Sequence, residues 1–272
     1  MANHKSQYGI IGFFDILGYQ SFLENNEDVA GEATEEVLNF IVTLEKRIPE
    51  RILLNISRNY KAVKKLLNEI KFLVFSDTIL LTSTYVKNDD LDRKIDKWAL
   101  FLVASLHLNR WMFEYGLPLR GVITTGNFLI KEHCFAGKPI VDAYKMCHDL
   151  DLAACVMTDN AYQEVTNLIN SSERKKIKKL LNDSIVKYLI PRKGGKEEKL
   201  PTLNLLTFRG LKPKSKKSNV KSKDNKTDVR QFIFNSFWKH NKDIKQEALS
   251  KVMNTEQYLR FIIRFLQRNK KV

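Results

Sequence analysis

Residues 8–19, YGIIGFFDILGY, place an aspartate at the end of an apolar run. The run from Tyr8 to Phe14 is β-type, Gly18 supplies a bend, and residues 32–46 have the pattern of an acidic helix, so this part predicts a strand, a turn and a helix. Burying an unpaired carboxylate is expensive. We therefore expect Asp15 to have a partner in the folded chain.

A second aspartate lies in a similar setting, in FSDTILL at 75–81. Two short apolar runs, 70–75 and 78–83, flank Ser76 and Asp77, which predicts a β-hairpin. If the strands bring Asp15 and Asp77 together, a divalent cation would resolve their repulsion. Alternatively, Asp15 caps the following helix and Asp77 makes only the local hydrogen bonds common in turns.

The rest of the sequence predicts further helices and strands. Helical spacing is present at 58–67, 90–115 and 140–149, β-type alternation at 120–125, and a hairpin or loop at 126–137. We expect the order β-α-α-β-β-α-β followed by a helix. Further along, the sequence predicts a strand near 153–157, one helix over 160–181, a strand pair at 185–190 and 203–207, and helices at 229–240 and 246–267.

The charge of the chain is concentrated near its end. The 272 residues contain 46 Lys and Arg against 31 Asp and Glu, a net charge of +15, of which residues 208–272 carry +13. Residues 212–227 are rich in Lys, Ser and Asn without apolar periodicity, as in solvated linkers. We predict a main domain over 1–208, a basic linker over 209–228 and a helical appendage over 229–272.

The basic tail has three interpretations. It is a solvated linker with a helical hairpin, an element that stabilises a dimer or contacts an effector, or a nucleic-acid-binding patch. Phe and Trp at helical core spacing favour packing over base binding. The lysines and glycines at 193–196 predict a hairpin loop, and a lysine that reaches a phosphate group from this loop is the alternative.

The cysteine count and the hydropathy of the sequence indicate the cellular compartment that we expect for the protein. Three cysteines, Cys134, Cys147 and Cys155, do not suggest a disulfide framework and fit a reducing compartment. The longest helical apolar stretch, 98–108, is too short to span a bilayer, and Asp15 interrupts the first apolar run. We expect a cytoplasmic protein without membrane association.

Four motifs, in order, resemble those of class III nucleotidyl cyclases: FFDILGY at 13–19, FSDTILL at 75–81, LRGVITTG at 119–126 and GKPIVDAYKM at 137–146. The resemblance covers roughly residues 8–190. It implies an α+β fold with a ferredoxin-like βααββαβ core, a C-terminal helical appendage being additional. It also implies a homodimer with active sites at the interface.

The resemblance further implies a metal site. Asp15 and Asp77, with the carbonyl of Ile16, would hold two Mg²⁺ or Mn²⁺ ions. The 3′-oxygen of a nucleoside triphosphate would attack the α-phosphorus, releasing pyrophosphate and a 3′,5′-cyclic nucleotide.

Departures from the family pattern concern the base and the phosphates. Leu73 occupies a position where purine cyclases carry a base-reading Glu or Lys, and a Leu side chain cannot hydrogen-bond. Cys134 occupies the second base-reading position. Lys145 stands where an arginine stabilises phosphate charge, and it lacks the planar fork of arginine. Val141 replaces the ribose-orienting asparagine, unless another register makes Asp142 its substitute.

Loss of the purine-reading residues, together with the motif 120–126 that begins at Arg120, is similar to the bacterial pyrimidine cyclases of Pycsar antiphage defence. Lys145 and Arg120 are then the candidate catalytic residues, and Leu73, Cys134 and Asp142 the candidate substrate-binding residues. The implied product is cyclic UMP or cyclic CMP, made from UTP or CTP. A degenerate cyclase fold that binds a nucleotide or a partner without turnover is the alternative.

Overall fold

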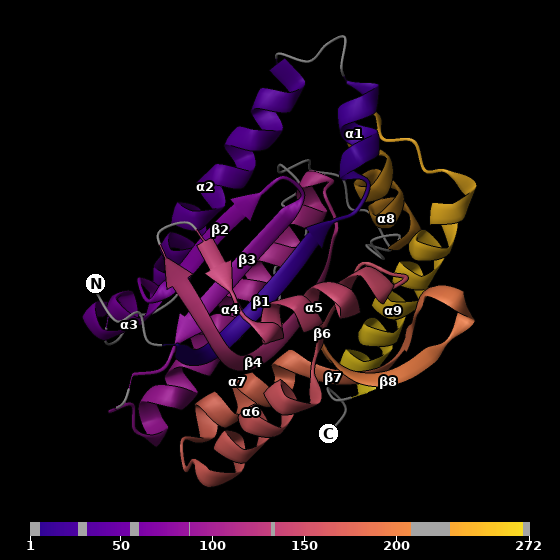
Figure 1. Cartoon of the computed structure of the whole chain (residues 1–272). Helices are drawn as coiled ribbons and strands as arrows, with labels where there is room; N and C mark the ends of the chain where they lie inside the picture. Colours follow the sequence, from indigo (N-terminus) through magenta and orange to yellow (C-terminus); the bar gives the residue numbers. More distant parts are fainter. Residues whose placement is uncertain are drawn as a thin grey trace, which may run out of the picture.

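The computed structural model of the chain describes residues 6–26, 32–54, 60–86, 88–131, 134–207 and 229–268 (Figure 1). The strands are β1 (Gln7–Ile16), β2 (Ile70–Phe75), β3 (Thr78–Thr84), β4 (Leu119–Lys131), β5 (Cys134–Ala136), β6 (Cys155–Met157), β7 (Ile185–Pro191) and β8 (Glu197–Leu203). The α-helices are α1 (Tyr19–Asn25), α2 (Glu32–Leu54), α3 (Tyr60–Leu67), α4 (Leu91–Tyr115), α5 (Lys138–Asp149), α6 (Asp159–Ser171), α7 (Lys175–Ser184), α8 (Val229–Trp238) and α9 (Leu249–Arg268). Short 3-10 turns lie at Lys193–Gly195, Lys239–Asn241 and Gln246–Ala248.

One sheet organises the chain, in the strand order β2-β3-β1-β4-β6-β8-β7, with β5 paired to the far end of β4. Strand β1 is antiparallel to both β3 and β4, and β2 is antiparallel to β3. With helices connecting β1 to β2 and β3 to β4, this is a ferredoxin-like arrangement. The predicted α+β fold is confirmed, and the order up to β4 differs from βααββαβ only by the additional short helix α1 before α2.

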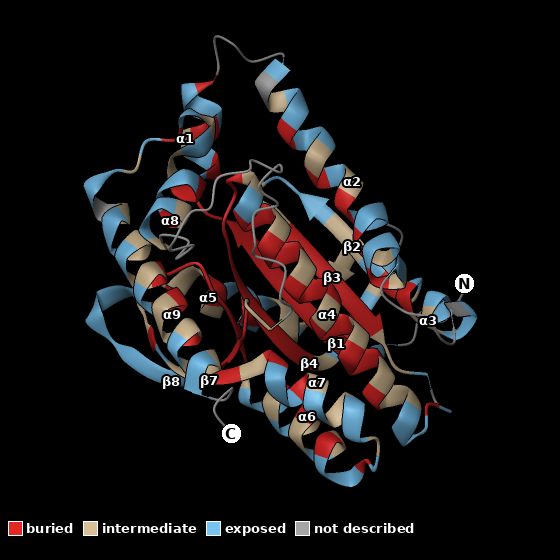
Figure 2. Cartoon of the chain, turned by 180° about the vertical axis from the view of Figure 1, so that it is seen from behind, coloured by how far each residue is buried: buried red, intermediate tan, exposed pale blue. Residues whose placement is uncertain are grey.

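Strand β1 is central because both of its faces are apolar. Ile10, Ile11 and Phe14 are fully buried, so the strand reads as a continuous apolar run rather than an alternation. Figure 1 shows α5 crossing one face of the sheet, and Figure 2 shows the largely buried α4 along the other. Side chains of β1 therefore point alternately to α4 and to α5.

Helix α4 has clear start and stop signals. The side chain of Asp90 accepts a hydrogen bond from the amide of Arg93 at 2.8 Å, capping the N-terminus. Gly116, with φ of 98°, adopts the left-handed conformation after the last turn. The buried face of α4 between these caps, including Trp98 and Phe101, packs behind the sheet.

Two sequence-based expectations are wrong. The single helix expected over 160–181 is two helices, because the chain breaks where Ser172 Oγ accepts the Arg174 amide and Arg174 pairs with Asp96 at 2.9 Å. The strand expected at 203–207 is instead β8, ending at Leu203. The short turn at Lys193–Gly195 connects β7 to β8 in a register that pairs Ile185 with Leu203. The chain then turns directly after Leu203.

Helices α8 and α9 pack on the sheet domain. Phe232 of α8 stacks on Phe113 of α4, with ring centroids 5.0 Å apart. On α9, the hydroxyl of the buried Tyr258 donates to the carbonyl of Leu203. The basic segment predicted as a linker, 209–228, lies outside the described residues. Within those residues, no helix combines the length and apolarity that crossing a bilayer requires.

Candidate active site

Asp15, near the end of β1, lies directly opposite Arg120 of β4. Nε of Arg120 donates to Oδ2 of Asp15 at 2.7 Å, and the two residues are 7% and 4% exposed. Burial raises the pKa of the Asp15 carboxyl, and the charge and hydrogen bond of Arg120 oppose that rise. The partner that the sequence required for a buried Asp15 is thus Arg120.

Asp77 lies beside the end of β1, in the turn between β2 and β3. Its carbonyl accepts a hydrogen bond from the amide of Ile16 at 2.8 Å, and the next residue, Thr78, pairs with Asp15. The negative charge of Asp77 also contributes, less than burial does, to the raised pKa of Asp15. The fold therefore places Ile16 and Asp77 beside Asp15, and their role as metal ligands stays a prediction.

His148, in the last turn of α5, joins this group although the sequence analysis did not select it. Its Nε2 lies 3.6 Å from Oδ1 of Asp15, and its ring centroid is 4.2 Å from that of Tyr144. Tyr144 in turn meets Phe13 of β1 edge to face, with centroids 5.7 Å apart. Spacing of four between Tyr144 and His148 on one face of a predicted helix was the available signal.

The other candidates on α5 are at its surface. Lys145 is exposed, and Asp142 is exposed and paired with Lys138 at 2.7 Å. Val141 is 51% exposed. An exposed lysine on α5, the helix that also brings His148 beside Asp15, is available to an anionic ligand.

The two candidate base-reading residues lie apart. Leu73 of β2 pairs with Leu80 of β3, which pairs with Phe13 of β1, so all three side chains share the face that α5 covers. Leu73 is partly buried there. Cys134 is exposed on β5 and pairs with Lys131 at the opposite end of β4 from the Asp15 pair. Within one chain, Leu73 shares the sheet face of Asp15, whereas Cys134 lies at the other end of β4.

The chemistry of the paired aspartates fits a magnesium or manganese ion. Oxygen ligands suit these ions, and Mg²⁺ is commonly held by one or two carboxylates completed by water and substrate phosphates. Across the described parts of the chain, no group of three or more His, Cys, Asp or Glu side chains is arranged to hold a metal. The aspartates thus fit an ion that a phosphate ligand also coordinates, rather than a closed structural site.

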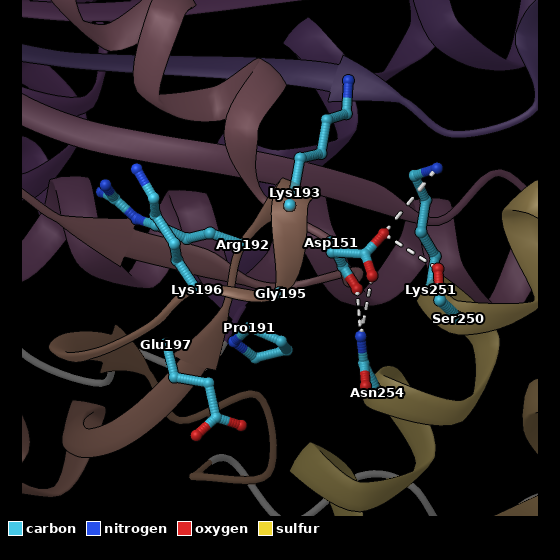
Figure 3. Close-up of a pocket in the computed structure, with 11 residues that line it drawn as sticks. Asp151, Pro191, Arg192, Lys193, Gly195, Lys196, Glu197, Ser250, Lys251 and Asn254 are labelled. Atoms are coloured by element: carbon cyan, nitrogen blue, oxygen red, sulfur yellow. Dashed lines mark hydrogen bonds and ion pairs between the residues drawn. The ribbon is translucent and has the colours of Figure 1, made fainter.

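A polar cavity of about 580 Å³ lies between the tip of the β7–β8 hairpin and α9 (Figure 3). Asp151 accepts hydrogen bonds there from Ser250 and Asn254, and Lys251 lies 3.9 Å from its carboxylate. The hairpin predicted at 193–196 is confirmed as this tip. Because the polar groups of α9 already engage Asp151, this contact joins the appendage to the sheet domain.

Comparisons with known proteins leave the family open. No family model matches the chain, and no curated protein matches it. Solved structures similar to it include the adenylyl cyclase CyaB from P. aeruginosa, with 14% identity, a TM-score of 0.44, and coverage of 73% of this chain and 94% of that one.

Two further similar structures are cyclase-related. The catalytic core of a rhodopsin-guanylyl cyclase with converted specificity has 13% identity and a TM-score of 0.46, over 73% of this chain and 96% of that one. A class III adenylyl cyclase-like ATP-binding protein from Pseudomonas aeruginosa has 18% identity and a TM-score of 0.41, over 65% of this chain and 40% of that one. Such TM-scores are too low to support an inference, so the fold assignment rests on the strand order of the chain itself.

Proposed function

We propose that this chain is a metal-dependent nucleotide cyclase, a phosphorus–oxygen lyase that acts on a pyrimidine nucleoside triphosphate. UTP is the preferred substrate and CTP the second, and the cyclic UMP or cyclic CMP formed is a signal in Pycsar antiphage defence. The observation that carries the cyclase proposal is the meeting of Asp15 and Asp77, where the Ile16 amide bonds the Asp77 carbonyl at 2.8 Å. The pyrimidine preference and the defence role rest on the motif resemblance.

The proposed reaction is an internal displacement. The 3′-oxygen of the ribose forms a bond to the α-phosphorus, the bond from that phosphorus to the β-phosphate oxygen breaks, the hydroxyl proton leaves to solvent, and pyrophosphate departs. Two Mg²⁺ or Mn²⁺ ions, held by Asp15, Asp77 and the Ile16 carbonyl, would supply charge neutralisation and an acidified 3′-hydroxyl. Lys145, exposed on α5, offers a positive charge to the phosphates, and Asp142 offers an acceptor to the ribose.

The proposed base specificity follows from the absence of a hydrogen-bonding group on the Leu73 side chain. Its apolar side chain offers no hydrogen bond to a purine edge, which favours a smaller base bound by contact and by other polar groups. Cys134 lies at the far end of β4 from Asp15. If Cys134 contacts the base, a second copy of the chain must supply it, which is the arrangement expected of an interfacial site.

A homodimer is also supported by exposed apolar side chains beside the aspartates. Phe75 of β2 pairs with Thr78 of β3, which pairs with Asp15 of β1. The Phe75 side chain is 76% exposed, and Tyr144 of α5 is 49% exposed. Apolar groups of this size on one face favour burial against a partner. We expect Phe75→Ser to shift the chain toward monomer in analytical ultracentrifugation and to lower cyclase activity in parallel.

Incubation with each of the four nucleoside triphosphates and Mn²⁺, with product detection by mass spectrometry, tests the activity. The expected result is cyclic UMP, with less cyclic CMP, from the parent chain and neither from Asp77→Asn. If no cyclic nucleotide forms, and Asp77→Asn binds triphosphate as well as the parent does, the proposal is wrong.

The second candidate is a protein that binds a nucleotide without turning it over. It is favoured by Val141, which cannot orient a ribose, and by Lys145 in place of an arginine. Triphosphate binding without product would identify it. A third candidate, nucleic-acid binding by the basic tail, predicts affinity that falls steeply with salt and depends on residues 209–272.

A further inference from the structure

We infer that Lys242, in the C-terminal appendage, is a positioning residue for the candidate active site, because it holds the turn that leads from Ile16 into α1. The inference rests on the proposed function, which makes Asp15 and the Ile16 carbonyl metal ligands. It gives the appendage a part in catalysis, although the appendage lies outside residues 8–190, the region that the motif resemblance covers.

Lys242 has a fixed place in the interior. It follows the 3-10 turn Lys239–Asn241, between α8 and α9, and it is 2% exposed. Its ammonium group donates to the carbonyl of Gly116 at 2.5 Å and to that of Ser236 at 3.2 Å. Burying a cation is costly unless it is hydrogen-bonded. These two carbonyls therefore determine where the ammonium group lies.

The aliphatic stem of Lys242 covers the turn between β1 and α1. A Cβ atom placed on Gly18, the residue that caps the N-terminus of α1, would lie 3.2 Å from Cδ of Lys242. Gly18 has φ of 77°, the left-handed conformation that favours glycine, and it comes two residues after Ile16. The turn cannot move toward the appendage without displacing this stem. Lys242 thus restricts the backbone that follows the proposed metal ligand.

The ammonium group of Lys242 holds the connection beside that turn. Gly116, which accepts its hydrogen bond, ends α4 and lies two residues before Pro118. The carbonyl of Pro118 accepts a hydrogen bond from the amide of Leu17 at 2.9 Å. One buried side chain therefore contacts both the connection that leaves β1 after Asp15 and the connection that enters β4.

Hydrogen bonds on both sides of Lys242 join its segment to α1. They include Asn25 Nδ2 to the Asn241 carbonyl at 2.8 Å, Asn26 Nδ2 to the His240 carbonyl at 3.0 Å, and the Asp243 amide to Ser21 Oγ at 2.9 Å. Figures 1 and 2 both show α1 beside α8. Helix α1 has seven residues, too few for a stable helix without tertiary contacts. Its position therefore depends on the appendage.

Two variants and a control separate this role from general stability. Lys242→Met keeps a stem of similar length and removes the ammonium group. Ser21→Ala removes the hydrogen bond from Asp243 and leaves Lys242 in place. Tyr258→Phe is the matched control, because it removes a hydrogen bond between the appendage and Leu203 of β8 instead of α1.

Each full-length variant is examined by the same four measurements. They are Mn²⁺ affinity by electron paramagnetic resonance with the metal alone, kcat and KM for UTP, urea unfolding, and hydrogen exchange of residues 16–26. The split between kcat and KM distinguishes misplacement of the reacting groups from loss of substrate binding.

For Lys242→Met we expect faster exchange at residues 16–26, Mn²⁺ binding about threefold weaker, kcat about tenfold lower and KM within about threefold of the parent, since small errors of position mainly affect the transition state. Ser21→Ala should change exchange and kcat in the same direction, by about two- to threefold. Tyr258→Phe should unfold at lower urea concentration and keep the exchange of residues 16–26, the Mn²⁺ affinity and the kcat of the parent.

Two results would overturn the inference. One is Lys242→Met with the kcat and Mn²⁺ affinity of the parent, which would make Lys242 a purely structural residue. The other is a loss of kcat that follows the urea midpoint in all three variants, Tyr258→Phe included. A parent chain that binds no Mn²⁺ and forms no cyclic nucleotide contradicts the proposed function instead. Exchange at residues 16–26 would still test the hold of Lys242 on the turn, and exchange equal to the parent in Lys242→Met would contradict it.

Discussion

Asp15 and Arg120 form a buried ion pair across β1 and β4, with Nε 2.7 Å from Oδ2. Asp77, which lies beside Asp15, is only half-buried and has no ion pair in the described part of the chain. The two aspartates of the proposed metal site therefore differ in what they contribute to folding.

Asp15→Asn is expected to lower the free energy of unfolding by about 3–5 kcal/mol, because it leaves the Arg120 cation buried without its partner. Asp77→Asn is expected to change it by less than about 1 kcal/mol, as for most exposed or half-exposed substitutions. Urea unfolding of both variants measures the difference. Equal losses would show that the Asp15 pair is not a net determinant of stability.

Glu164 of α6 joins that helix to the start of the sheet. Its carboxylate accepts hydrogen bonds from Tyr8 at 2.8 Å, Tyr85 at 2.5 Å and Trp98 Nε1 at 3.2 Å. Glu164→Gln exchanges one acceptor oxygen for a donor that faces hydroxyl groups, so we expect a loss of about 1–3 kcal/mol in unfolding free energy. Glu173→Gln, at an exposed site, is the control. A urea midpoint equal to that of the control would contradict this assignment.

The sequence predicted the elements whose signals are local. Helix α4 follows from its apolar spacing and from Asp90 and Gly116 at its ends, and the β2–β3 hairpin follows from two apolar runs around Ser76 and Asp77. The strand order then places Asp77 beside Asp15. Expectations failed at 172–174 and 203–207, where a side chain bonding the local backbone and a hairpin register decide the structure.

The contacts of Arg120 could not be read from the sequence. The residue is 105 positions from Asp15, and their pairing depends on the register of β1 against β4. A one-residue slip of that register would move Arg120 to the other face of the sheet. Likewise His148 approaches Asp15 only because α5 crosses β1. The resemblance suggested a functional role for Arg120, and its contacts with Asp15 and His148 are visible only in the fold.

Tyr258 anchors α9 to the sheet. The hydroxyl of this fully buried residue donates to the Leu203 carbonyl at the end of β8. Tyr258→Phe keeps the ring and leaves that carbonyl without its donor, so we expect a loss of about 1–2 kcal/mol in unfolding free energy. Tyr188→Phe, at a partly exposed ring packed against Tyr258, is the control and should cost less. Equal losses would show that the hydroxyl bond does not stabilise the chain.

Lys242 makes the stability of the chain depend on pH. Its buried ammonium group donates to the carbonyls of Gly116 at 2.5 Å and Ser236 at 3.2 Å, and burial lowers its pKa to about 7. In the unfolded chain a lysine has a pKa of about 10.4. Between these values the unfolded state binds more protons, so this residue makes the unfolding free energy rise with pH from about 7 to about 10, by at most ~1.4 kcal/mol per pH unit.

Lys242→Met removes this titration. The difference in unfolding free energy between the parent and Lys242→Met should therefore change in favour of the parent as pH increases from 6.5 to 9.5. Guanidinium unfolding at several pH values measures it, and Lys245→Met, at an exposed lysine nearby, should run parallel to the parent. Parallel curves for Lys242→Met as well would mean that Lys242 titrates as an exposed lysine does. The appendage would then make no pH-dependent contribution through this side chain at the end of α4.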